Sequence, residues 1–272
     1  MTDASGIDWG DAFSNRAYVP DGESYPARWA SDALAFRDGA LGRRDIAYGD
    51  HPRERFDLFL PEDAARGLAV IIHGAFCIDF DKSSWSNLAV GALAHGWAVA
   101  LPNYILAPEA RIRAITRQIG RAIESAAALV TGPIRLTGHS AGGHLASRMV
   151  CDDTPLSPAT SARLERLVSI SGLHDLRPLR LNGMNEKLRL DAEEAKAESP
   201  ALHSPLLGVE VIAWVGAAER PEFLRQSALL AEAWRRRGAR ARLVADPGRH
   251  HFDVIDGLKA PDDPLAMAFA GD

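Results

Sequence analysis

The sequence has little cysteine and no long uninterrupted apolar run. Its 272 residues include only Cys77 and Cys151, too few for a disulfide framework or a Cys-x-x-Cys metal or redox motif. The longest apolar stretch, residues 87–108, is interrupted by glycine, histidine and proline. It therefore predicts a helix, a turn and a buried strand rather than a membrane span.

The chain also lacks a basic excess. Its formal net charge of −5 argues against nucleic acid or an anionic membrane as the main partner. The acidic start "MTDASGIDWGD" has neither the basic region nor the apolar core of a signal peptide. We therefore expect a cytoplasmic protein that acts on a small molecule, and a homodimer is compatible with this composition.

What the sequence does have is a regular alternation of short β-rich runs and helical stretches from about residue 55. "GLAVIIH" (67–73) is typical of a strand buried on both faces, and "IRLTG" (134–138) predicts another strand. Between them, isoleucines at helical spacing predict a long amphipathic helix from residue 112 to about 130. The pattern predicts an α/β fold with a mostly parallel sheet covered on both faces.

The length is near the upper limit for one hydrophobic core, so we expect a single domain over residues 1–272. Residues 1–44 precede the alternation and are expected to form an N-terminal cap or edge segment. Within them, residues 11–40 predict one short helix, and residues 172–207 are also irregular. Such segments either pad an edge or cover a pocket.

The strongest functional signal is "GHSAGG", which places Ser140 in a G-x-S-x-G pattern between a predicted strand and a predicted helix. This pattern is typical of a nucleophile elbow, where small flanking residues let strand and helix pack closely around a strained serine. A serine there needs a base and oxyanion donors. The Ala141 N–H offers one donor, and the loop at His73-Gly74-Ala75 follows an earlier strand and offers a second.

The base should follow the last strand and the acid an earlier one. His250 and His251 both satisfy the spacing for the base, and the residues alone do not separate them. For the acid, Glu219 and Asp175 compete, and Glu219 is favoured because it lies one strand before the histidines. The order Ser, Glu, His along the chain suits a catalytic triad.

Other polar residues have simpler explanations. His139 and His144 are expected to hydrogen-bond to backbone, and Cys77 is expected to be a small buried hydrophobe rather than a nucleophile. No metal-binding motif accompanies the histidines, so neither a metal nor another cofactor is predicted.

Taken together, these stretches resemble the bacterial branch of α/β-hydrolases related to kynurenine formamidase (arylformamidase), which in turn resemble hormone-sensitive-lipase-like esterases. The stretches that carry the resemblance are "IIHGAFCIDFDKSSWSNLAVGAL", "NYILAPEARI", "GHSAGGHLA", "AERPEFLRQS" and "HHFDVID". The resemblance runs from about residue 45 to 258. It implies an α/β-hydrolase fold of about eight strands.

Position by position, the resemblance implies Ser140 as nucleophile, Glu219 as acid and His251 as base. It further implies an oxyanion hole from the N–H groups of Gly74 or Ala75 together with Ala141. The residues expected to line the substrate pocket are Phe76, Cys77 and His139.

The chain departs from the family pattern at Ala75, which replaces a glycine, and at Phe76-Cys77, which replaces Tyr-Trp. An alanine methyl is unfavourable if that backbone needs positive φ. The expected function is a cofactor-independent serine hydrolase that cleaves a small aryl formamide or ester. The alternatives are a general short-chain carboxylesterase and a hydrolase-fold binding protein without turnover.

Overall fold

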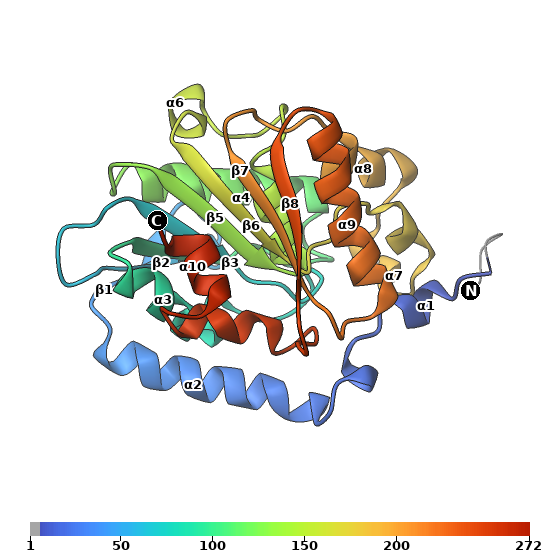
Figure 1. The fold of residues 1–272 in the computed structure, drawn as a ribbon, viewed down its shortest axis with the longest axis horizontal. Helices are drawn as coiled ribbons and strands as arrows, with labels where there is room; N and C mark the ends of the chain where they lie inside the picture. The colour runs from blue at the N-terminus through green and yellow to red at the C-terminus, as the bar shows by residue number, and fades with distance from the viewer. Residues whose placement is uncertain (1–5) are drawn as a thin grey trace.

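A computed structural model describes residues 6–272, and the first five residues lie outside the described part. The chain forms one eight-stranded sheet in the order β1-β2-β4-β3-β5-β6-β7-β8 (Figure 1). β1 and β4 pair with β2 in antiparallel fashion, and all other neighbours are parallel. The strands are β1 (Gly42–Ala47), β2 (Arg55–Phe59), β3 (Leu68–Ile72), β4 (Ala98–Pro102), β5 (Ile134–His139), β6 (Leu164–Ile170), β7 (Glu210–Gly216) and β8 (Arg240–Asp246).

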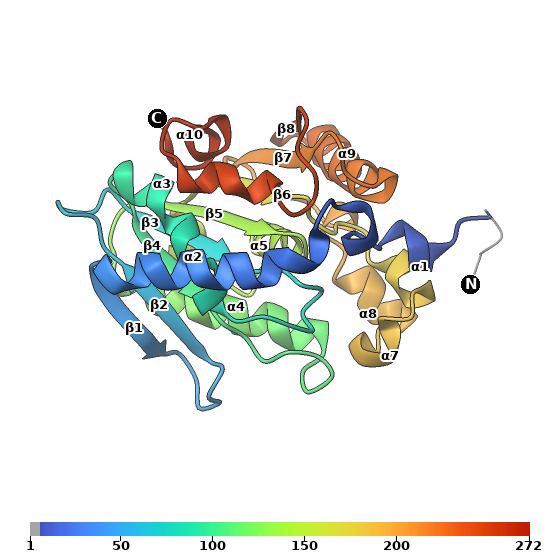
Figure 2. The ribbon, with the colours of Figure 1, turned by 90° about the horizontal axis from the view of Figure 1, so that it is seen from below.

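Helices cover both faces of this sheet (Figure 2). One face carries α4 (Ile112–Ala127), α5 (Ala141–Arg148) and α9 (Pro221–Arg236). The other carries α2 (Tyr25–Gly39), the 3-10 helix η3 (Lys82–Ala89), α3 (Val90–Ala94), the 3-10 helix η6 (Val254–Lys259) and α10 (Pro264–Ala270). The short helices are α1 (Trp9–Ala12), α6 (Pro158–Ser161), α7 (Asn185–Leu188), α8 (Ala192–Ala197), η1 (Arg16–Tyr18), η2 (Gly22–Ser24), η4 (Arg177–Leu181) and η5 (Pro200–Leu202).

The side chains of β3 explain this layering. All five of its residues are buried, so the strand can lie only between two apolar layers. Leu68 and Val70 belong to the core under α4, α5 and α9, whereas Ala69 and Ile71 belong to the core under η3 and α10. The predicted α/β-hydrolase fold, with a mostly parallel sheet of about eight strands, is confirmed.

Two elements differ from the sequence-based expectation. The strand β1 was not predicted, because Gly42–Ala47 is a mostly exposed edge strand without a continuous apolar run. Instead of one short helix, the N-terminal segment contains the 15-residue α2, of which only Tyr25, Trp29 and Ala33 are buried. Both elements lie at the periphery, where apolar periodicity is weak.

In the part of the chain that the structure describes, no helix combines the length and the apolar content that crossing a bilayer requires. The segment considered for a signal peptide begins with residues 1–5. These five residues lie outside the described part of the chain.

Candidate active site

The backbone of Ser140 is held in an unusual conformation at the point where β5 ends and α5 begins. Its φ of 56° and ψ of −117° lie outside the regions that L-residues prefer. The Ser140 N–H donates to the Ile170 carbonyl of the neighbouring strand at 2.8 Å, which anchors the turn. Such local strain is maintained only where surrounding contacts enforce it, and it is common at catalytic serines.

Close packing around Ser140 requires glycine at three positions. A Cβ at Gly142 would lie 2.0 Å from the Ile72 carbonyl oxygen. A Cβ at Gly138 would lie 2.3 Å from the Gly142 carbonyl oxygen, and one at Gly74 would lie 2.5 Å from the His139 carbonyl oxygen. These contacts are far shorter than a carbon can tolerate, so the glycines allow two strands and a helix to converge on the serine.

An imidazole and a carboxylate are paired beside this turn. His251 Nδ1 donates to Glu219 Oε2 at 2.6 Å, and both side chains are buried. The other carboxylate oxygen of Glu219 accepts from the Ser171 hydroxyl and from the Gly216 N–H. Because the carboxylate occupies Nδ1, the remaining nitrogen Nε2 of His251 is left for proton transfer.

The alternative candidates for the acid and the base, Asp175 and His250, contact residues other than this pair. Asp175 forms an ion pair with Arg177 at 2.8 Å. His250 lies within hydrogen-bond distance of the Tyr25 hydroxyl and of Asp253. The geometry therefore pairs Glu219 with His251, as the family resemblance implies.

The loop after β3 has a left-handed turn. Ala75, Phe76 and Cys77 have φ values of 67°, 52° and 58°, and the Ile78 N–H closes the turn on the Ala75 carbonyl. Each such residue with a side chain costs about 1 to 2 kcal/mol. The Tyr104 ring stacks on the His73 ring. The Tyr104 hydroxyl donates to the carbonyls of His73 and Gly74, which stabilises the entry to the loop.

Among residues 6–272, the loop after β3 and the start of α5 both carry unpaired backbone N–H groups near Ser140. Within residues 6–272, the N–H groups of Gly74, Ala75 and Ala141 donate no hydrogen bond. Unpaired N–H groups are uncommon in folded proteins, and a cluster of them beside a serine is suited to a developing oxyanion.

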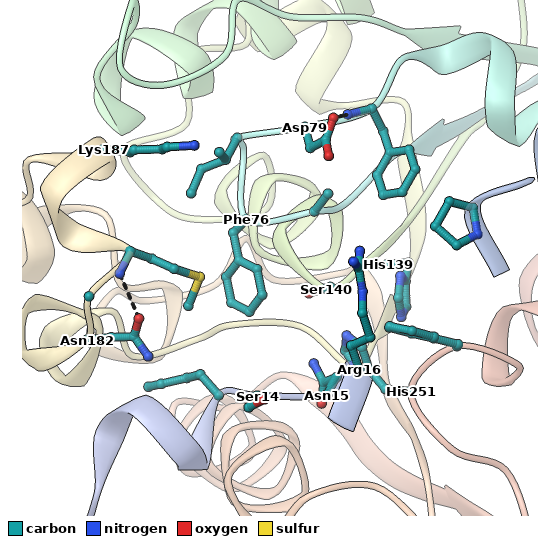
Figure 3. Close-up of a pocket in the computed structure, with 18 of the residues that line it drawn as sticks. Ser14, Asn15, Arg16, Phe76, Asp79, His139, Ser140, Asn182, Lys187 and His251 are labelled. Atoms are coloured by element: carbon teal, nitrogen blue, oxygen red, sulfur yellow. Dashed lines mark hydrogen bonds between the residues drawn. The ribbon is translucent and has the colours of Figure 1, made fainter. Parts of the chain in front are cut away.

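A cavity of about 630 Å³ opens at Ser140, and both irregular segments contribute to it. Residues 10–16 and 182–187 supply part of its lining. Figure 3 shows Phe76 and Asn182 on one side of Ser140 and His139 and His251 on the other.

The two sides differ in composition. One side, which we call the aromatic wall, consists of Trp29, Phe80, Trp85 and Phe252, with Trp29 in ring contact with the other three. The other side, which we call the loop wall, consists of Phe13, Phe76, Ile78, Asn182 and Met184.

The model of the alpha/beta hydrolase family matches residues 69–271. The chain belongs to the alpha/beta hydrolase family. It is 27% identical over 224 residues to kynurenine formamidase of Danio rerio, covering 79% of this chain and 76% of that protein. The corresponding enzyme of Salmo salar is 26% identical over 246 residues, covering 84% of this chain and 83% of that protein.

A crystal structure from Silicibacter sp. TM1040, described as a "putative thioesterase", is also similar to this hydrolase. The two chains are 47% identical, with a TM-score of 0.93 over 97% of this chain and 99% of the other. Esterase structures below 25% identity, such as the carboxylesterase EstE1 at 16% and a TM-score of 0.69, share the fold.

Two sequence-based expectations about this hydrolase were wrong. Cys77 does not line the cavity, because the left-handed turn directs its side chain into the core, where burial raises the pKa of the thiol to about 12. His139 lines the cavity as expected, but its ring makes no hydrogen bond of normal geometry within residues 6–272, although the His251 backbone lies near it. His144, by contrast, bonds to the Glu198 carbonyl at 2.6 Å, as predicted.

Several residues of the site were missed by the sequence analysis. Ser171 lies in no recognisable sequence motif, yet its hydroxyl donates a hydrogen bond to the Glu219 carboxylate. The aromatic wall was not anticipated, because its members come from α2, the loop after β3, η3 and the segment after β8. Phe80 and Trp85 lie in one stretch, but Trp29 and Phe252 are far from it in the chain, so no common motif joins the four.

One group of side chains in residues 6–272 has the composition of a metal site: Asp152, Asp153 and His203. None of them lines the cavity, and Asp153 forms an ion pair with Arg148 at 2.7 Å. The group therefore does not contribute to the chemistry at Ser140.

Proposed function

We propose that the protein is a cofactor-independent serine hydrolase that cleaves a small aryl formamide or carboxylic ester through an acyl-enzyme. The observation that carries this proposal is that Ser140, on its strained turn, and His251, with Nδ1 bonded to Glu219, line the same cavity. The kynurenine formamidases of fish, which the chain resembles over most of its length, point to aryl formamides.

In the proposed reaction, Ser140 Oγ attacks the substrate carbonyl carbon while His251 Nε2 accepts the hydroxyl proton. Glu219 stabilises the imidazolium and holds its tautomer. The N–H groups of Gly74 or Ala75 and of Ala141 receive the oxyanion. His251 then protonates the leaving amine or alcohol, and the carbon–nitrogen or carbon–oxygen bond breaks.

The acyl-enzyme is resolved by the same groups. A water molecule gives its proton to His251 Nε2 and attacks the acyl carbonyl. Collapse of the second tetrahedral intermediate returns the proton to Ser140 and releases the carboxylic acid. The scheme requires no metal, so hydrolysis is expected to persist after dialysis against EDTA.

The first test is labelling with a fluorophosphonate. The wild-type protein should gain one phosphonate, mapped by peptide mass spectrometry to Ser140, and Ser140→Ala should gain none while keeping its circular dichroism spectrum. Ser171, which also ends a strand, serves as an internal control and should stay unmodified. An unlabelled wild-type protein would favour a binding protein without turnover.

A second test decides the substrate class. Rates on N-formylkynurenine, a short-chain aryl ester and an aryl thioester should be measured with the same enzyme preparation. The arylformamidase assignment predicts that the formamide has a kcat/KM at least comparable to that of the esters. Fast ester cleavage with negligible formamide turnover would support the alternative of a short-chain carboxylesterase. A much higher rate on the thioester would instead agree with the description of the relative from Silicibacter.

A further inference from the structure

Ser171 is a second strained serine at the carboxyl end of the sheet. It directly follows β6, the neighbour of the strand that leads into Ser140, and its φ is 51°. The Ser171 N–H donates to the Trp214 carbonyl of β7 at 2.7 Å, so this turn is anchored to the next strand as the turn at Ser140 is. Glycine adopts such a φ without steric cost, and a side chain retained in spite of the strain points to a function for its hydroxyl.

The hydroxyl of Ser171 is not available to a substrate. Ser171 is fully buried and does not line the cavity at Ser140. Its hydroxyl donates to Oε1 of Glu219, whose side chain is equally inaccessible. A hydrogen bond to a charged acceptor is stronger than one between neutral groups, and Ser171 therefore acts mainly on the carboxylate.

The Glu219 carboxylate depends on such donors because no basic side chain other than His251 is paired with it. In the described part of the chain, no lysine or arginine forms an ion pair with Glu219. Arg220, the next residue, directs its guanidinium to Asp11 instead. A buried charge is unfavourable unless hydrogen bonds compensate its lost hydration, so each donor to this carboxylate matters.

The donors are divided between the two carboxylate oxygens. Oε1 accepts from the Ser171 hydroxyl and from the Gly216 N–H at 2.9 Å, which leaves Oε2 for His251 Nδ1 at 2.6 Å. Two donors on one oxygen fix the rotation of the carboxylate, whereas the Gly216 N–H alone would let Oε2 turn away from His251. A glutamate has one more rotatable bond than an aspartate, so it needs this restraint more.

We propose that Ser171 is a positioning residue, whose hydroxyl holds the Glu219 carboxylate in the orientation in which Oε2 meets His251. The proposal rests on the proposed serine-hydrolase function. Ser171 touches no reacting atom and acts on catalysis only through Glu219 and His251. The alignment of this pair determines how well His251 accepts the proton of Ser140, so the hydroxyl should affect kcat far more than KM.

Three substitutions separate the hydroxyl from the backbone strain. Ser171→Gly removes both, Ser171→Ala removes the hydroxyl alone, and Ser171→Thr keeps the hydroxyl but adds a methyl group in a fully buried site. Ser171→Gly should therefore have a higher Tm than Ser171→Ala, and Ser171→Thr should have a lower Tm than the wild type.

The rates should follow the hydroxyl and not the stability. On an aryl ester, kcat should fall about tenfold in both Ser171→Gly and Ser171→Ala with KM nearly unchanged, whereas Ser171→Thr should retain more of kcat than either. Ser227→Ala is the matched control, because it removes a buried hydroxyl on α9 that has no hydrogen-bond partner within residues 6–272. A wild-type kcat in Ser171→Gly, or a fall in Ser227→Ala as large as that in Ser171→Ala, would overturn the proposal. If Ser171→Thr does not fold, the other two variants decide alone.

A measurement without turnover separates this proposal from the proposed function. The Nδ1–H proton of His251 should give a downfield resonance in the proton NMR spectrum of Ser140→Ala, assigned by its loss when His251→Ala is added. Adding Ser171→Gly instead should shift this resonance upfield, because the hydrogen bond to Glu219 is weakened. If the wild-type protein hydrolyses neither ester nor formamide but the shift is observed, the hydrolase proposal fails and the role of Ser171 stands. An unshifted resonance would reject the role of Ser171.

Discussion

The two walls of the cavity are built in different ways. The aromatic wall belongs to a continuous buried cluster in which Trp29 packs against Phe80, Trp85 and Phe252 at centroid distances of 4.9 to 5.8 Å. The loop wall comes from the C-terminal end of α1 at Phe13, the left-handed turn after β3 and the segment before α7. Met184 on that wall is only partly buried.

This difference suggests a division of tasks. Interlocked aromatic rings hold a fixed shape and suit a planar group. A wall of short loops with a methionine adapts more easily to groups of different length. We therefore expect the aromatic wall to select the leaving group and the loop wall to set the limit on the acyl group.

The largest expected effect comes from Glu219, whose contact with His251 is needed whichever wall a substrate binds against. Glu219→Gln should lower kcat by about 10³- to 10⁴-fold on every substrate, because an amide cannot stabilise the imidazolium of His251. Stopped-flow rates on an aryl ester and an alkyl ester should fall by the same factor. Asp175→Asn removes a comparable carboxylate outside the cavity and is the control. A loss confined to one substrate would contradict the assignment of Glu219.

The next effect tests the aromatic wall. Trp29→Leu keeps an apolar side chain but removes the ring that contacts Tyr25 and the other three rings of the aromatic wall. It should lower the free energy of unfolding by about 2 kcal/mol, measured by urea denaturation. It should also raise KM for aryl esters more than for alkyl esters of the same acid. Equal changes in both KM values would mean that the aromatic wall does not hold the leaving group.

At the loop wall a smaller effect is expected, and it is a relative gain in activity on a longer acyl group. Met184→Ala shortens a partly buried side chain that lines the cavity. It should cost less than about 1 kcal/mol of stability, since the residue is not in the core. The ratio of kcat/KM for a hexanoate ester to that for the acetate should rise severalfold. Met267→Ala, at an exposed methionine on α10, is the matched control and should leave the ratio unchanged. A constant ratio in Met184→Ala would place the acyl group elsewhere.

The smallest effect concerns the turn that joins the loop wall to Ser140. Ala75 has a φ of 67°, which glycine adopts without steric cost. Ala75→Gly should raise stability by up to about 1 kcal/mol, measured as an increase in Tm. Hydrolysis should persist, because the backbone N–H is retained. A decrease in Tm would indicate that the methyl group contributes packing that outweighs the strain.

Much of this molecule was predictable because it depends on local patterns. Buried strands are apolar along their whole length, and the isoleucine stripe of α4 lies within one helix, so the fold class followed from periodicity. Ser140 was identifiable because its turn demands glycine on both sides. The edge strand β1 was missed because an exposed strand needs no apolar run.

The sequence by itself thus determined the fold, the strained serine and the chain order of a serine, a carboxylate and a histidine. Only the tertiary structure decided that Glu219 rather than Asp175 meets His251, and that Cys77 points into the core. It also decided that His139 lies buried beside an aromatic wall drawn from three separate segments. The physical reason is that these features depend on contacts between distant parts of the chain, which no local spacing encodes.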